Sequence, residues 1–248
     1  MLSLFLASSA STSSAEPAGR GINCTEALGV DGIIYMHDGV PVRTAIAVME
    51  HVAWLAKGRS FVEVGSRHGD LIECVSHVTT SAVSVEASKF YCPELAKRAA
   101  ASSGRWSSMC AVFSAETRGL PRAQLFFTWI QHYFVVAFLA SMHSLQRQGA
   151  VATDTEFAFN FAGPEHPPER HCWNALRIFA TRYSDVPYHE HNGKRGRGKF
   201  TVGVFQPSHL NMSAVDAAAR GICHKGSALA LLSSSATYSA ASADARLG

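Results

Sequence analysis

The stretch Phe61-Val-Glu-Val-Gly-Ser-Arg-His-Gly-Asp-Leu-Ile72 decides the fold. It predicts a short buried strand at 60–64 that leads through a turn into a helix at 70–78. The turn contains Gly65, and Gly69 opens the helix. Glycine permits a positive φ and leaves no Cβ between the backbone and a ligand. The helix N-terminus adds free N–H groups and a positive dipole end, which favour an anionic ligand group.

A second predicted strand, 81–85, leads to Glu86, which lies 21 residues after Gly65 (86 − 65). In nucleotide-binding β-α-β units, an acidic residue about 20 positions after the glycine turn accepts hydrogen bonds from the ribose hydroxyls. A carboxylate has enough acceptor sites for such a two-point contact. The spacing therefore predicts a nucleoside-like ligand between the turn and Glu86.

Short apolar runs alternate with helical patterns on both sides of this unit, which indicates β-α units around a mainly parallel sheet. Further strands are expected at 108–113, 124–130, 150–160, 186–191 and 199–206, and helices at 42–56, 94–101, 131–148 and 168–182. This makes seven strands. The last two are neighbours in sequence, so the final strand can insert antiparallel.

The pattern Glu63-x-Gly65-x-x-x-Gly69 resembles motif I of the class I S-adenosylmethionine (SAM)-dependent methyltransferases, and Glu86 resembles their ribose-binding acid. The resemblance implies a three-layer α/β, Rossmann-like fold with a seven-stranded, mostly parallel sheet and a terminal antiparallel strand hairpin. It also implies SAM as the cofactor. Gly65 and Ser66 would line its methionine part, and Glu63 would lie near its amino group.

Three positions depart from the family pattern, and one of them is Ala123-Gln124, where the fourth strand often begins with Asp. Arg67 stands near the place of the usual third glycine. Many family members carry Gly-Asp after the third strand, where the acid contacts adenine, whereas this chain has Ser114-Ala115-Glu116. By resemblance, Glu116 takes the adenine-side role.

The expected function is methyl transfer from SAM to a small molecule or an exposed side chain. Such a transfer depends mainly on positioning the acceptor, and a base is needed only if the acceptor must lose a proton early. The base candidates are His132, His189 and Glu190, and Trp129 is either a substrate-side or a core residue. The alternatives are a non-catalytic domain of the same fold and a nicotinamide-dependent oxidoreductase, against which the terminal hairpin argues.

Composition narrows the class of protein further. Hydrophobic residues make up 47% of the chain and charged residues 17%, which predicts a globular protein. A net charge of +3 and the lack of an Asn-Pro-Pro-Tyr motif argue against nucleic acid as a partner. No apolar stretch is long enough to span a membrane. The sequence carries no signal for an oligomeric state.

The six cysteines include no Cys-x-x-Cys pair, so no metal site is expected. Several stand in apolar runs, which predicts buried free thiols and a reducing compartment. The default location is therefore the cytoplasm, with a cleaved N-terminal targeting segment as the alternative. We expect a leader at 1–20, one methyltransferase-like domain at 21–212 and a low-complexity tail at 213–248.

Overall fold

The computed structural model describes most of the chain between residues 22 and 223. The described ranges are 22–29, 36–37, 40–41, 43–129, 132–161, 167–189 and 197–223. The expected leader at 1–20 lies outside them, as does the chain beyond residue 223.

Within these ranges, a seven-stranded sheet forms the centre of the domain. Its strands are β3 (Ser60–Val64), β4 (Ser81–Glu86), β5 (Ser107–Cys110), β6 (Leu125–Thr128), β7 (Glu156–Phe161), β8 (Arg182–His189) and β9 (Arg197–Phe205). A separate small sheet pairs β1 (Met36–His37) with β2 (Val40–Pro41).

The strand order is β5-β4-β3-β6-β7-β9-β8. Strands β3 to β7 pair in parallel, and β9 inserts antiparallel between β7 and β8. This is the Rossmann-like, seven-stranded class I methyltransferase layout, so the expected fold class and the terminal hairpin are confirmed. The order reverses at β3, because β4 lies on one side of it and β6 on the other. In open α/β sheets, ligands bind beyond the carboxyl ends of the strands at such a switch point.

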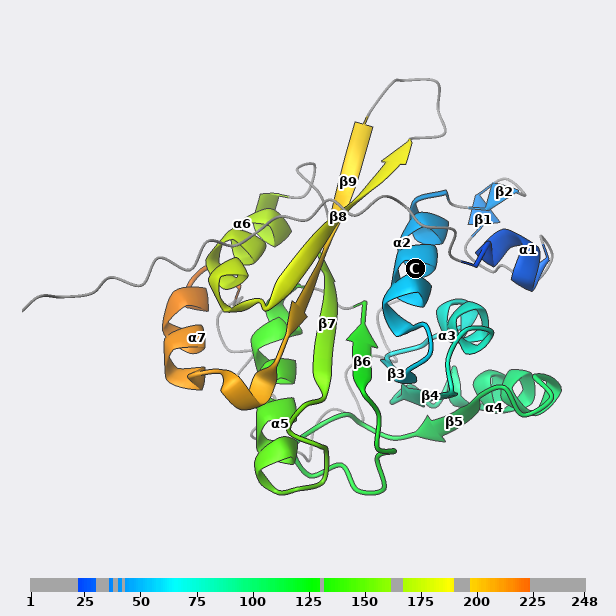
Figure 1. Ribbon diagram of the computed structural model, residues 1–248, viewed down its shortest axis with the longest axis horizontal. Coiled ribbons are helices and arrows are strands. Elements are labelled where there is room, and N and C mark those ends of the chain that lie inside the picture. The colour runs from blue at the N-terminus through cyan, green and yellow to red at the C-terminus, as the bar shows by residue number, and fades with distance from the viewer. Residues whose placement is uncertain are drawn as a thin grey trace, which may run out of the picture.

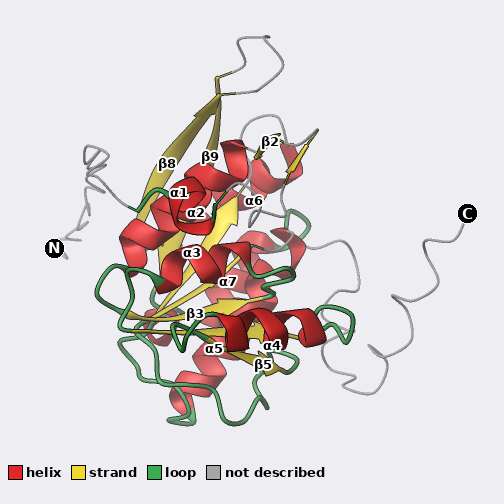
Figure 2. Cartoon of the chain, turned by 90° about the vertical axis from the view of Figure 1, so that its right-hand side faces the viewer, coloured by secondary structure: helices red, strands yellow, loops and turns green. Residues whose placement is uncertain are grey.

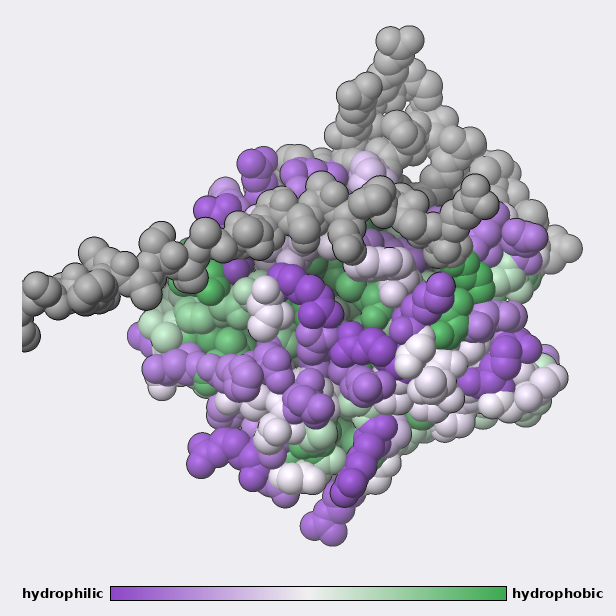
Figure 3. Space-filling view, in the orientation of Figure 1, coloured by the Kyte–Doolittle hydropathy of each residue, from purple (hydrophilic) through white to green (hydrophobic). Residues whose placement is uncertain are grey.

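Helices cover both faces of the sheet (Figures 1 and 2). One face carries α1 (Cys24–Leu28), α2 (Arg43–Ala56), α3 (Asp70–Ser76) and α4 (Cys92–Ala101). The other carries α5 (Val135–Arg147), α6 (Pro167–Leu176) and α7 (Met212–Ala219). Short 3₁₀ helices lie at His132–Phe134, Arg177–Phe179 and Pro207–His209. On the face shown in Figure 3, hydrophobic residues appear in separate patches between hydrophilic ones.

Strand β7 shows how the residues build these layers. Phe157, Phe159 and Phe161 alternate along it and enter the core beneath α5 and α6, because successive strand residues point to opposite faces. Ala158, between them, packs on the α2 and α3 side. Strand β7 is thereby buried on both faces, as expected in a mainly parallel sheet.

Two element boundaries differ by the largest margin from the expected ones. The helix expected to reach residue 182 ends at Leu176, because Tyr183 pairs with Gly203 of β9 and belongs to β8. Trp173 of α6 packs over Gly203, where a Cβ would lie 2.5 Å from its ring. The strand expected from 150 begins only at Glu156, after a turn whose carbonyls accept hydrogen bonds from the Gln146 amide.

The C-terminal tail was expected to begin at residue 213, but the residues that follow it are folded as far as Cys223. Helix α7 packs against α5 and α6, with Val215 and Ala219 fully buried. Cys223 follows it and forms a disulfide with Cys172 of α6. Residues 213–223 therefore belong to the domain.

The expectation of free thiols is wrong. All six cysteines lie in the described ranges and are paired, as Cys24–Cys74, Cys92–Cys110 and Cys172–Cys223. The apolar runs correctly indicated burial of Cys74, but its partner is 50 residues away in sequence and comes close only through the packing of α1 on α3. In the described part of the chain, no helix has the length and apolar character needed to cross a bilayer.

Candidate cofactor site

The loop that follows β3 has the backbone shape that its glycines predict. Gly65 has φ +79° and Gly69 has φ +83°, and both values lie in the left-handed region. The Gly65 N–H donates to the Val85 carbonyl at 2.7 Å, and the Gly69 N–H donates to the Ser66 carbonyl at 2.8 Å. The first bond anchors the loop to β4, and the second closes it at the start of α3.

The two glycines serve different purposes. A Cβ on Gly69 would lie 2.8 Å from Cδ2 of Leu95, so this glycine allows α4 to pack closely on the loop. A Cβ on Gly65 would approach nothing nearer than Oγ1 of Thr128 at 4.0 Å, so here the conformation is what requires glycine. Arg67 also has a positive φ, +47°, at the place where the family usually has a glycine.

Glu86, the last residue of β4, lies directly against this loop. Its Oε2 accepts a hydrogen bond from the Arg67 N–H at 2.9 Å, and its Oε1 accepts one from the Ser88 N–H at 2.8 Å. The side chain is 7% exposed. Each carboxylate oxygen has two lone pairs, so each keeps acceptor capacity for a ligand hydroxyl.

Glu63 is buried below the same loop. Burial is the main reason that its pKa is raised to about 8; hydrogen bonds from Ser66 and Ile72 lower the pKa, and the charges of Asp70 and Glu86 raise it. Its Oε2 has no hydrogen-bond partner among the described residues. The carboxyl group is therefore mostly neutral at pH 7 and has an unused acceptor, and a cationic group placed beside it would favour ionisation.

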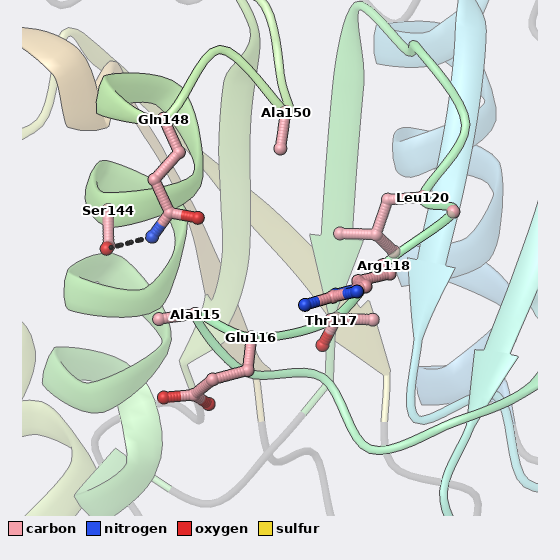
Figure 4. A pocket seen from close by; sticks show the side chains of 9 residues that line it. Ala115, Glu116, Thr117, Arg118, Leu120, Ser144, Gln148 and Ala150 are labelled. Atoms are coloured by element: carbon pink, nitrogen blue, oxygen red, sulfur yellow. Dashed lines mark hydrogen bonds between the residues drawn. The ribbon is translucent and has the colours of Figure 1, made fainter.

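Glu116 lies apart from this cluster. It occupies the helix-free loop 111–124 between β5 and β6, where its Oε2 accepts a hydrogen bond from the Ser114 hydroxyl at 2.8 Å. It lines an open pocket of about 540 Å³ together with Arg118, Ser144 and Gln148 (Figure 4). None of the residues around the β3 loop lines this pocket.

The pocket does not have the position of a cofactor site in this fold. Leu120 and Ala150 line it, and these residues precede β6 and β7, at the amino ends of the strands. Ligands of open α/β sheets bind at the opposite edge, beyond the carboxyl ends. The candidate site is therefore the β3 loop with Glu63 and Glu86, and Glu116 is not brought to it.

Trp129 comes directly after β6, so it lies at the same edge of the sheet as the β3 loop. It is 36% exposed, and its ring meets that of Phe200 on β9 edge to face at 5.8 Å. Asn160, near the carboxyl end of β7, was not expected as a site residue. It is buried, and neither of its amide atoms has a hydrogen-bond partner in the described structure. A polar residue in the apolar run EFAFNF was the available signal.

The three base candidates stay predictions. His132 lies in the 3₁₀ helix after Trp129, and its ring contacts that of Tyr133. His189 is the last residue of β8, and nothing is described of its side chain; Glu190 lies outside the described residues. Among the described residues, no group of three or more His, Cys, Asp or Glu side chains is arranged to hold a metal ion.

No family model and no curated protein sequence matches this chain. Among solved structures, it is similar to TehB from Haemophilus influenzae, with 10% identity, a TM-score of 0.44 and coverage of 64% of this chain and 61% of that one. It is also similar to a ribosomal protein L11 methylase from Lactobacillus delbrueckii subsp. bulgaricus (12% identity, 66% and 78% coverage, TM-score 0.45). A third is the precorrin 8w decarboxylase of Methanobacterium thermoautotrophicum (13% identity, 71% and 97% coverage, TM-score 0.49). Because these TM-scores are below 0.5, the fold class rests on the strand order.

Proposed function

We propose that this chain is a SAM-dependent methyltransferase that transfers a methyl group to a small molecule or an exposed side chain. The observation that carries the proposal is the position of Glu86, whose carboxylate lies against the glycine loop at the switch point of the sheet. A carboxylate there has acceptor sites for the two hydroxyls of a ribose.

The residues of the loop suit the other parts of SAM. Gly65 leaves open space over the backbone, where a ligand can approach closely. The unused oxygen of Glu63 suits the amino group of the methionine part, because the ammonium ion donates hydrogen bonds and favours an ionised carboxylate. When bound, SAM supplies an activated methyl group on its sulfonium sulfur.

The chain's own contribution is positioning. The acceptor atom must lie in line with the methyl group, and holding the two together removes much of the entropic cost of the reaction. Trp129 offers a partly exposed aromatic face at the same edge of the sheet, which suits an acceptor with an apolar or planar part. The acceptor side of the site therefore lies over β6 and β7, and the cofactor side over β3 and β4.

A non-catalytic methyltransferase-like binding domain is the second candidate. The left-handed conformation of Arg67, where the family has glycine, and the position of Glu116 away from the loop favour it. A nicotinamide-dependent oxidoreductase is disfavoured, because the antiparallel insertion of β9 differs from the strand order 3-2-1-4-5-6 of the Rossmann fold.

Calorimetric titration with S-adenosylhomocysteine (SAH) tests the proposal. We expect micromolar binding by the wild type. Glu86→Ala removes two charge-assisted hydrogen bonds worth about 3 kcal/mol together, so it weakens binding roughly 100-fold. Glu94→Gln, an exposed carboxyl change on the neighbouring helix α4, is the matched control and keeps wild-type affinity. No binding at millimolar SAH, or binding of NADH in its place, contradicts the proposal.

Turnover separates the two candidates. SAH release from SAM is measured with a panel of phenols, amines and carboxylic acids as acceptors. Release with at least one acceptor supports the enzyme, whereas tight SAH binding without any release supports the non-catalytic domain.

A further inference from the structure

The disulfide between Cys92 and Cys110 lies beside the candidate ribose-binding acid. Glu86 and Cys110 are paired residues on the parallel strands β4 and β5. The Ala111 N–H donates to the Glu86 carbonyl at 2.9 Å, immediately after Cys110. Cys92 is the first residue of α4, which the chain reaches directly after Glu86 through the turn 87–91. The disulfide thus closes a covalent loop of residues 92–110. Glu86 lies just before this loop and is joined to its far end by the hydrogen bond from Ala111.

The turn between Glu86 and Cys92 carries one of the two amides that hold the Glu86 carboxylate. The Ser88 N–H donates to Oε1 of Glu86 at 2.8 Å, and the Ser88 carbonyl accepts the Cys92 N–H at 3.0 Å. The turn is therefore fixed to Glu86 at one end and to the disulfide at the other. Hydrogen bonds therefore link the position of Cys92 to that of Ser88 and to the Glu86 carboxylate.

Strand β5, which provides the other half of the disulfide, is held weakly by packing. It is an edge strand of four residues, Ser107–Cys110, and none of them is buried. The α4 N-cap residue, Tyr91, makes no side-chain capping bond. Leu95 anchors the middle of α4 and Met109 packs against the core, but Cys92 is only partly buried and Cys110 is exposed, so the disulfide is the direct covalent connection between the start of α4 and the end of β5.

We propose that Cys92 and Cys110 are positioning residues of the cofactor site: their disulfide holds Glu86 against the β3 loop, and cofactor binding requires the oxidised chain. The inference rests on the proposed function. It also places the working protein in an oxidising compartment, since all six cysteines are paired.

The same disulfide is the most accessible of the three. Cys110 is exposed and Cys92 is partly buried, whereas the other four cysteines are fully buried. A dithiol such as dithiothreitol therefore reaches it first. Reduction breaks the S–S bond: the disulfide takes up two electrons and two protons from dithiothreitol and becomes two thiols, while dithiothreitol becomes its cyclic disulfide.

The test compares two double variants of the full chain. Cys92→Ala with Cys110→Ala removes this disulfide, and Cys172→Ala with Cys223→Ala removes the one on the opposite face of the sheet. We expect SAH affinity to fall about tenfold or more in the first variant and to stay within about twofold of the wild type in the second, because only the first displaces Glu86. Circular dichroism checks that both variants are folded. If the first variant does not fold, mild reduction of the wild type, with the opened disulfide identified by mass spectrometry, gives the same comparison.

A second readout does not depend on any ligand. The Arg67 and Ser88 N–H groups donate to the Glu86 carboxylate, so their hydrogen exchange is expected to speed up about tenfold when this disulfide is lost. The positioning role is overturned if loss of the disulfide leaves hydrogen exchange at both amides unchanged. It is also overturned if the wild type binds SAH and the variant without the disulfide binds SAH equally well. If loss of the disulfide speeds up exchange at these amides but the wild type does not bind SAH, the positioning role stands and the proposed function is overturned.

Discussion

Replacing Glu63 by glutamine tests whether the buried carboxyl group receives the cationic part of the ligand. The substitution keeps the size of the side chain and an oxygen acceptor, and it removes the ionisation. Burial raises the pKa of Glu63 to about 8, so most of this group is protonated at pH 7 before the ligand binds. An ammonium group beside its Oε2 favours the ionised form, and the proton must then leave.

The magnitude follows from that fraction. We expect wild-type SAH binding at pH 7 to release most of one proton per site, and binding to Glu63→Gln to release none. Calorimetric titrations in buffers of different ionisation enthalpy measure this number, because the observed heat then varies linearly with the buffer enthalpy. The reasoning is refuted if the wild type binds SAH with the same heat in all buffers, or if Glu63→Gln gives the wild-type slope.

The same group makes stability depend on pH without ligand. The folded pKa of Glu63 lies above the ordinary value of 4.5, so the fold favours the neutral form. The stabilising contribution of Glu63 to the free energy of unfolding is fully present below about pH 4.5 and is lost as the pH rises through about 8. The total loss is at most about 5 kcal/mol. Urea unfolding at pH 5.5 and pH 8.5 measures the loss, and the difference between wild type and Glu63→Gln isolates it from other titrating groups.

Two further substitutions test the geometry of the site. Gly69→Ala is expected to lower the free energy of unfolding in urea by about 2–4 kcal/mol, because it adds a 2.8 Å contact with Leu95 to a left-handed backbone. The control Gly119→Ala also has a positive φ but has open space around it, so it should lower the free energy of unfolding by only about 1 kcal/mol. Equal losses in the two variants would contradict the close approach of α4. Trp129→Ala is expected to raise KM for the acceptor about tenfold or more while the Kd for SAH stays unchanged; a weaker SAH Kd would place this ring on the cofactor side.

The sequence predicted the central unit well because its signals are local. The strand 60–64, the glycine turn and the acid at the end of the next strand all follow from residues within a short stretch, and the structure places Glu63, Gly65, Ser66, Gly69 and Glu86 around one loop. The number of strands and the terminal hairpin were also accessible, since alternating patterns and adjacent final strands indicate them.

What the sequence did not reveal depends on contacts between distant residues. The partner of Cys172 is Cys223, beyond a helix that an alanine-rich pattern made look like tail. The end of α6 is determined by the pairing of Tyr183 with Gly203, which overrides a helical spacing of apolar residues. Glu116 looked close to the adenine side by counting from β5, but the loop carries it to a pocket beside α5.

A crystal structure of the chain with SAH tests the central claim most directly. We expect electron density for the ribose beside Glu86, with Oε1 and Oε2 within hydrogen-bond distance of its two hydroxyls and the adenosyl group across the loop 65–69. SAH bound elsewhere, for example in the pocket beside Glu116, or a Glu86 carboxylate that makes no contact with the ribose, would contradict the account.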